Sequence, residues 1–131
     1  DKFTAVNTKV QDIGTEFNGK FSLIVCNPPY AKIDSGDHDQ NIEIDLCRRE
    51  VALSVPELLK AVSFSLKYGG RFCICHRADR LIEIVTAMKE NNIEPKILQF
   101  VCGKGKEPYL FLMEGVKGGK SGLKVLNSLI N

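Results

Sequence analysis

Phe21-Ser22-Leu23-Ile24-Val25-Cys26-Asn27-Pro28-Pro29-Tyr30 joins a short apolar run to a stiff polar corner. The run from Phe21 to Cys26 contains β-branched residues and is nearly all apolar, which predicts a strand buried on both faces of a parallel sheet. Two successive prolines cannot donate backbone hydrogen bonds, so the strand must end there. Ligands of open α/β sheets bind at the carboxyl ends of such strands. The stretch therefore predicts an α/β fold with a functional site beginning at Asn27.

The corner from Asn27 to Tyr30 suits the binding of an amino group. A residue before a proline is held extended, so Asn27 and Pro28 form a stiff rim in front of Pro29. The Asn27 side-chain oxygen and the Pro28 carbonyl can each accept one proton of an –NH2 group, which aims the nitrogen lone pair outward. Facing an electrophilic methyl group, that lone pair becomes a nucleophile through orientation and electrostatics. Tyr30 can stack on the planar ring that carries the amine.

The alternative for this corner is a plain turn, because Asn-Pro is a common turn initiator. An isolated Asn-Pro pair would favour that interpretation. Here Asn27-Pro28-Pro29-Tyr30 follows a buried strand directly, which favours the functional interpretation.

Asn27-Pro28-Pro29-Tyr30 resembles the catalytic motif of amino-group methyltransferases that use S-adenosylmethionine. Other segments are similar to the tRNA adenine-N6 methyltransferase family, which modifies the adenine beside the anticodon of valine tRNA. These segments are Arg48-Arg49-Glu50, Leu66 to Phe72, His76 to Leu81, Glu94-Pro95-Lys96, and Lys117-Gly118-Gly119 followed by Gly122 to Val125. The resemblance covers most of the chain from about Asp12 onward.

The resemblance implies a Rossmann-like fold that transfers a methyl group from S-adenosylmethionine to the exocyclic amine of an adenine in tRNA. Its implied catalytic residues are Asn27, Pro28, Pro29 and Tyr30, and its implied cofactor-binding residues are Asp12, Ile13 and Asn27. Asp12 would receive the amino group of the cofactor adenine, since a carboxylate accepts hydrogen bonds and donates none. From the residues alone, Asp12 is equally well explained as the start of a turn from Asp12 to Thr15.

The short motif specifies the chemistry better than the substrate. It also occurs in methyltransferases that act on guanine, on DNA and on protein glutamine. Methylation of guanine in rRNA or of protein glutamine is therefore an alternative. A non-catalytic module that binds RNA or a partner, derived from such a domain, is another.

The 131 residues predict one partial catalytic domain, residues 1–131. A complete fold of this type begins with a strand, a glycine-rich turn and a helix, whose backbone amides approach the cofactor. No Gly-x-Gly precedes Asn27, so the sequence predicts the C-terminal portion: a parallel sheet with an antiparallel terminal hairpin. The strand that should pair with the missing half would then expose an edge open to self-association. We expect this chain alone to be inactive and to bind the cofactor poorly.

Hydrophobic spacing and turn residues predict the remaining elements. Expected strands are 3–10, 71–76, 96–102, 109–116 and an edge strand within 123–130. Expected helices are 46–54, 54–67 with Ser54 at its cap, and 80–91 with Asp79 at its cap. Tyr68-Gly69-Gly70 is expected to end the second helix, and 31–45 is expected to be a long loop.

Charge gives weak support for a nucleic-acid partner. The net charge of +2 is too small to demonstrate one. Five lysines near the C-terminus could form an electrostatic footprint for RNA, although ordinary solubilising lysines explain them slightly better. They are Lys104, Lys106, Lys117, Lys120 and Lys124.

The cysteines predict a reducing compartment and no metal site. Five are present, an odd number, and most fall within predicted apolar strands, which is typical of free thiols in the cytoplasm. In Cys73-Ile74-Cys75-His76, strand alternation sends the two thiols to one face and His76 to the other. No second cluster completes a tetrahedral set. No apolar run reaches the length of a membrane span, and no signal peptide opens the chain.

Overall fold

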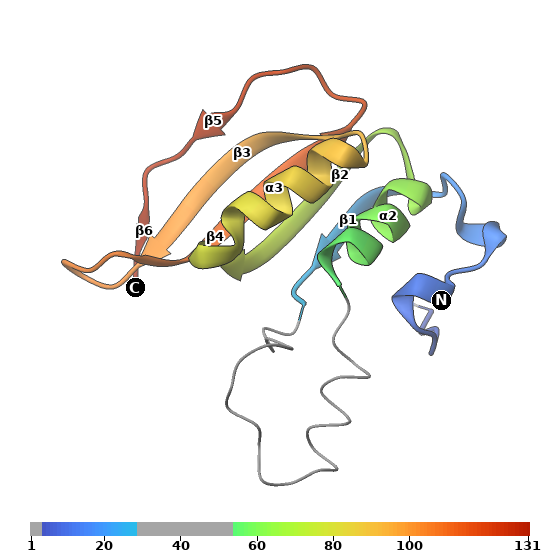
Figure 1. Cartoon of the computed structure of the whole chain (residues 1–131), viewed down its shortest axis with the longest axis horizontal. Coiled ribbons are helices and arrows are strands. Elements are labelled where there is room, and N and C mark those ends of the chain that lie inside the picture. The colour runs from blue at the N-terminus through green and yellow to red at the C-terminus, as the bar shows by residue number, and fades with distance from the viewer. Residues whose placement is uncertain (1–3, 29–53) are drawn as a thin grey trace, which may run out of the picture.

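The computed structural model describes residues 4–28 and 54–131. In this part of the chain two helices lie on one face of a mixed sheet (Figure 1). The strands are β1 (Phe21–Cys26), β2 (Leu66–Arg77), β3 (Ile93–Cys102), β4 (Pro108–Lys117), β5 (Lys124–Val125) and β6 (Leu129–Ile130). The helices are α2 (Val55–Ser65) and α3 (Leu81–Glu90), with 3-10 turns η1 (Val10–Asp12), η2 (Thr15–Phe17) and η3 (Ala78–Arg80).

The strand order is β1-β2-β4-β3-β5, and β6 also pairs with β3. β1 and β2 run parallel, whereas β4 is antiparallel to both β2 and β3. The helix α2 makes the crossover that parallel neighbours require. The predicted α/β fold, a parallel sheet with an antiparallel terminal hairpin, is confirmed. The edge strand expected within 123–130 appears as two short parallel pairings with β3.

The hydrophobic core lies between the helices and the sheet. Strand alternation in β2 buries Phe72 and Ile74 under the helices and leaves Cys73 and Cys75 on the other face. The helices contribute Leu58, Leu59, Val62, Ile84, Ala87 and Met88. No described helix has the length and apolar character needed to cross a membrane.

β1 departs from the prediction that both of its faces are buried. Leu23 and Val25 are 47% and 71% exposed. β1 has β2 as its one strand neighbour among residues 4–28 and 54–131, and α2 and α3 cover only the opposite face. Within the described residues, nothing covers the outer face of β1. The backbone edge of β1 that points away from β2 also has no strand partner among them.

Helix α2 begins as predicted but ends differently. The Ser54 Oγ accepts a hydrogen bond from the Glu57 amide at 3.3 Å, which is the expected cap. The helix stops at Ser65 and β2 begins at once, so the predicted turn at Tyr68-Gly69-Gly70 is wrong. Gly69 adopts a φ of 80°, which accommodates an irregularity in the pairing of β1 with β2 without interrupting the strand.

Two further predictions need correction. No strand forms over residues 4–9, because this segment pairs with no described strand, and the half-buried Val10 packs against the core instead. Asp79 does not cap α3: it lies within η3, and its Oδ2 accepts from the Arg77 Nη2 at 2.5 Å. The predicted strands at 96–102 and 109–116 are confirmed. The expected loop at 31–45 and nearly all of the helix expected at 46–54 lie outside the described residues.

Candidate functional site

Asn27 stands at the carboxyl end of β1, one residue beyond the strand. The parallel register pairs Val25 with Cys73 and Cys26 with Ile74, so the ends of β1 and β2 meet at one edge of the sheet. The Asn27 residue is exposed and the following Pro28 is half-buried. Asn27 is therefore not enclosed by the core.

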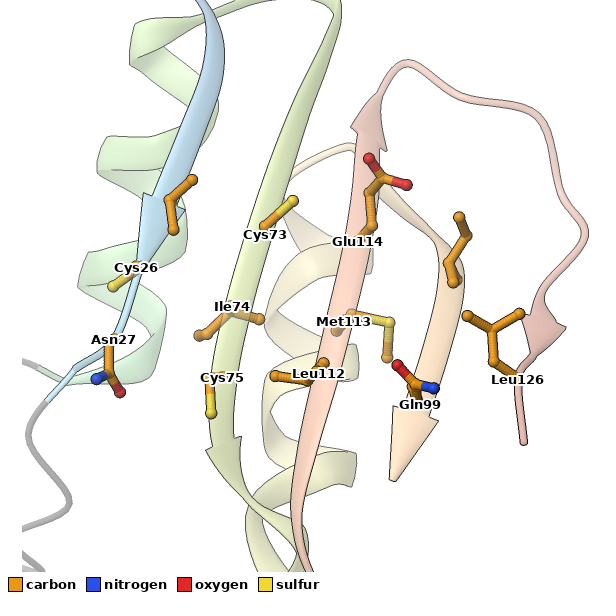
Figure 2. Close-up of a pocket in the computed structure, with 12 residues that line it drawn as sticks. Cys26, Asn27, Cys73, Ile74, Cys75, Gln99, Leu112, Met113, Glu114 and Leu126 are labelled. Carbon is orange, nitrogen blue, oxygen red and sulfur yellow. The ribbon is translucent and has the colours of Figure 1, made fainter. Parts of the chain in front are cut away.

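Asn27 also lines a hollow of about 470 Å³ on the face of the sheet away from the helices (Figure 2). Val25 and Asn27 border it from β1 and its end, and β2 contributes Cys73 and Cys75. Figure 2 shows Asn27 and Cys75 near the ends of their neighbouring strands. The walls are mainly apolar, which suits contact with a planar ring or with an apolar side chain more than with a free ion.

Two of the thiols in this hollow, Cys26 and Cys73, are unsuited to act as nucleophiles. Burial raises the pKa of Cys26. The pKa of Cys73 is raised as well, first by burial and then by the Glu114 carboxylate. Glu114 itself is paired with Arg71 at 3.2 Å. Since the thiolate is the reactive form, these protonated thiols serve as wall residues.

His76 lies at the carboxyl end of β2 but on the helix-facing side, where it is 5% exposed. Its Nδ1 accepts a hydrogen bond from the Arg77 amide at 2.9 Å. Burial, and then the nearby Arg80 guanidinium, lower the pKa of His76, so its imidazole is neutral at neutral pH. The predicted separation of His76 from the two thiols is confirmed, and the described residues contain no group of three or more metal-ligating side chains.

Two of the three residues implied to hold the cofactor, Asp12 and Ile13, do not line the hollow that Asn27 borders. Asp12 belongs to η1, and Ile13 lines a hollow of about 330 Å³ against α2. The hollow lined by Ile13 and the hollow lined by Asn27 share no residues. Pro29 and Tyr30 lie outside the described residues. The roles of these four residues remain predictions.

The described residues fit one side of an S-adenosylmethionine site. Asn27 and Pro28 provide oxygen acceptors at the edge of the sheet where such a ligand binds. The backbone donors of a glycine-rich turn are not among them, and Asp12 is not gathered to the same hollow. Within the part of the chain that the structure describes, Asn27 and Pro28 therefore lie at the edge where such a ligand would bind, and Asp12 lies outside the hollow that Asn27 lines.

The five candidate RNA-binding lysines differ in their surroundings. Lys104, Lys106, Lys120 and Lys124 are exposed. Lys117 is half-buried and donates hydrogen bonds to backbone carbonyls at the end of α2, so its charge already has a structural task.

Sequence reasoning passed over Arg77, the last residue of β2. The alternation that places Cys73 and Cys75 on the open face continues to Arg77. This alternation was visible in the sequence and predicts that Arg77 lies on the same face as the two thiols. Arg77 belongs to the same carboxyl edge as Asn27.

No family model and no curated protein matches the sequence. Solved structures do match its fold. A predicted O-methyltransferase from Agrobacterium tumefaciens superposes with a TM-score of 0.63 at 18% identity, covering 86% of this chain and 44% of that protein. A candidate DNA modification methylase from Thermus thermophilus, in complex with S-adenosylmethionine, gives 0.53 at 13% identity, covering 88% and 56%. The antibiotic-resistance methyltransferase Kmr gives 0.52 at 15% identity, covering 86% and 58%.

These likenesses show that the chain has a Rossmann-like fold similar to part of the fold of solved methyltransferases. The chain spans about half the length of the solved structures that it matches, 44% to 58% in these three comparisons. The matched proteins carry the names of different kinds of methyltransferase, so the fold alone does not select a substrate.

Proposed function

We propose that the protein forms the amine-binding part of an S-adenosylmethionine-dependent methyltransferase that methylates the exocyclic amino group of an adenine in tRNA. The observation that carries this proposal is the exposed Asn27, followed by Pro28, at the carboxyl end of β1 in a methyltransferase-like fold. An amide and a proline carbonyl at that position match the chemistry that an amino-group acceptor needs.

Asn27 and Pro28 act by orientation rather than as strong bases. Each supplies one oxygen that accepts a proton of the substrate –NH2 group. The nitrogen is thereby held with its lone pair directed away from the rim, and Tyr30 stacks on the ring. S-adenosylmethionine, when bound, supplies an electrophilic methyl group. The amine nitrogen would gain that methyl group as the methyl–sulfur bond breaks and S-adenosylhomocysteine leaves, and it would give up one proton to solvent.

Adenine in tRNA is the substrate favoured by the residues from Arg48 to Val125 that resemble the tRNA adenine-N6 family. The target base must be unpaired or flipped out, because an amino group within a base pair is inaccessible to the rim. Such a substrate is consistent with a cytoplasmic enzyme. Asp12 and Ile13 are proposed to contact the cofactor once the glycine-rich part of the site is present.

The cofactor requirement gives a simple binding experiment. Isothermal titration of the 131-residue chain with S-adenosylmethionine should give no saturable micromolar binding, because half of the expected contacts are absent. Micromolar binding would show that the glycine-rich segment is dispensable.

Product identification tests the proposed substrate. The protein, produced from its natural reading frame so that any preceding sequence is included, is incubated with labelled S-adenosylmethionine and unmodified tRNA. Mass spectrometry of the digested tRNA should then detect N6-methyladenosine. Methylguanosine, methylglutamine in a protein substrate, or no product with any of these substrates would overturn the proposal in favour of the guanine enzyme, the glutamine enzyme or the binding module.

A further inference from the structure

Arg77 is a cation at the carboxyl edge of the sheet, on the open face that also carries Cys73 and Cys75. It ends β2, where it pairs with Leu110 of β4. Alternation along β2 puts it on the face of Cys73 and Cys75, both of which line the hollow that Asn27 borders. Its guanidinium side chain is 39% exposed.

The register sets the spacing between Arg77 and Asn27. Cys26 pairs with Ile74, so Asn27 is level with Cys75 on the neighbouring strand. Adjacent strands are about 4.8 Å apart, and Arg77 lies two residues further along β2, roughly 6.6 Å. A nucleotide carries its base amine and its phosphate at opposite ends. An amine held at Asn27 therefore leaves the sugar and phosphate to extend past the edge, in the direction of Arg77.

The guanidinium of Arg77 has more N–H donors than the described residues use. It donates from Nη2 to Asp79 at 2.5 Å, and no other described residue accepts from its side chain. A guanidinium carries five N–H donors. The Asp79 carboxylate is 48% exposed, and an exposed ion pair of this kind is weak, so it orients the side chain without saturating it.

Arg80 is the neighbouring cation and is committed elsewhere. Its Nη2 donates to the Glu83 Oε1 at 2.8 Å, and its Nε donates to the other oxygen of the same carboxylate. This two-bond pair fixes Arg80 to the first turn of α3. Arg77 is therefore the better placed of the two to bind an anion at the edge of the site.

We propose that Arg77 binds the backbone phosphate of the nucleotide whose base amine is held at Asn27. The inference rests on the proposed function and adds a positioning contact to the same site. A guanidinium matches phosphate geometry with two parallel hydrogen bonds. Such a contact fixes the position of the nucleotide on the protein but does not read its base.

Binding of a fluorescein-labelled single-stranded oligoadenylate, measured by fluorescence anisotropy over a range of salt concentrations, tests the proposal independently of methyl transfer. Arg77→Gln should weaken binding about tenfold. The slope of log affinity against log salt should become shallower by about 0.7, because one phosphate contact is lost. Arg77→Lys should retain the slope while losing part of the affinity, since it keeps the charge but not the fork.

Arg71→Gln is the matched control. Arg71 lies on the same strand and face, is 59% exposed and is ion-paired with Glu114, but stands six residues before Arg77 and away from the carboxyl edge. It should leave the affinity and the salt slope near those of the unmodified protein. Equal effects of the two Gln variants, an unchanged slope in Arg77→Gln, or no binding by the unmodified protein would overturn the proposal. Circular dichroism of each variant verifies that it remains folded.

Steady-state methylation separates failure of this inference from failure of the proposed function. If tRNA is methylated, Arg77→Gln should raise KM for tRNA about tenfold and leave kcat little changed. Methylation with the same KM for tRNA in Arg77→Gln and Arg71→Gln would contradict the role of Arg77 and leave the proposed function standing. A protein that methylates no RNA would contradict the proposed function itself.

Discussion

The Lys117 ammonium group on β4 donates a hydrogen bond to the Ser63 carbonyl oxygen of α2 at 2.6 Å. It also donates to the Leu66 carbonyl at 2.9 Å, and it lies 4.9 Å from the centre of the Tyr68 ring. The last carbonyls of a helix lack intrahelical partners and carry the negative end of its dipole. A lysine from a distant strand thus serves as the end cap that the sequence led us to expect at Gly69.

Lys117→Met should destabilise the fold, because it leaves part-buried carbonyls at the end of α2 without this cationic donor. The expected loss is about 1–2 kcal/mol in the free energy of unfolding, measured by urea denaturation. Lys104→Met is the control, since Lys104 is exposed in the β3–β4 loop. Equal stability of the two variants would show that the contact contributes nothing measurable.

His76 predicts how stability changes with pH. Burial lowers the pKa of His76 from its ordinary value of 6.5, so the native state holds the neutral imidazole. As the pH falls through 6.5, the unfolded chain takes up a proton that the native state does not, and the free energy of unfolding decreases. This contribution is complete above the unfolded pKa and is lost as the pH falls below it.

The measurement is the urea midpoint between about pH 5.5 and pH 7.5, a window above the usual range of carboxylates. The midpoint should be lower at the acid end. His76→Gln should flatten this dependence, whatever its effect on stability at neutral pH. If His76→Gln kept the original dependence of the urea midpoint on pH, another group would be responsible for that dependence.

Gly115 on β4 is expected to tolerate no side chain. A Cβ placed there would lie 2.4 Å from the Met88 Cε and 2.7 Å from the Ile93 Cγ2, and both of those side chains are fully buried. Gly115→Ala should therefore cost about 1–3 kcal/mol through overpacking, measured by thermal or urea unfolding. Gly103→Ala should cost less, because its nearest neighbour would be the flexible side chain of Lys106 at 3.3 Å. The reverse order of the two variants would refute this packing argument.

The open edge of β1 predicts self-association. Strands with unpaired backbone groups and exposed apolar side chains recruit other strands, and a lysine on the edge suppresses this. The 131-residue chain should sediment as a concentration-dependent mixture of monomer and dimer, and Val25→Lys should shift it toward monomer.

Ile82→Lys provides the matched comparison, since Ile82 is 76% exposed on α3, away from the edge. It should leave the mixture unchanged. A chain that is monomeric at every concentration would argue against association through β1, as would an equal effect of both lysines.

Local pattern was enough to predict much of the fold. The apolar run before Asn27, the Ser54 cap and the two strands of the C-terminal hairpin depend on neighbouring residues, and each was correct in kind. The predictions failed where a distant part of the chain decides the outcome. The end of α2 was predicted at Gly69 because the sequence does not reveal that Lys117 donates hydrogen bonds to the carbonyls of Ser63 and Leu66.

The site divides in the same way. The position of Asn27 follows from the proline pair beside it, and the residue is exposed in the structure. Asp12 was assigned through the resemblance, and the strand expected just before it does not form over residues 4–9, because strand formation depends on a pairing partner that sequence spacing cannot supply. Arg77 was missed because its position relative to Asn27 depends on the register between β1 and β2.

The rate of methyl transfer to tRNA by Asn27→Ala tests the central claim most directly. The protein from its natural reading frame is compared with this variant and with Asn7→Ala, which removes an exposed amide from the N-terminal segment. Loss of a preorganised acceptor should lower kcat about 100-fold to 1,000-fold in Asn27→Ala, whereas Asn7→Ala should retain the full rate. An unchanged kcat in Asn27→Ala would contradict the claim that the rim at the end of β1 holds the reacting amine.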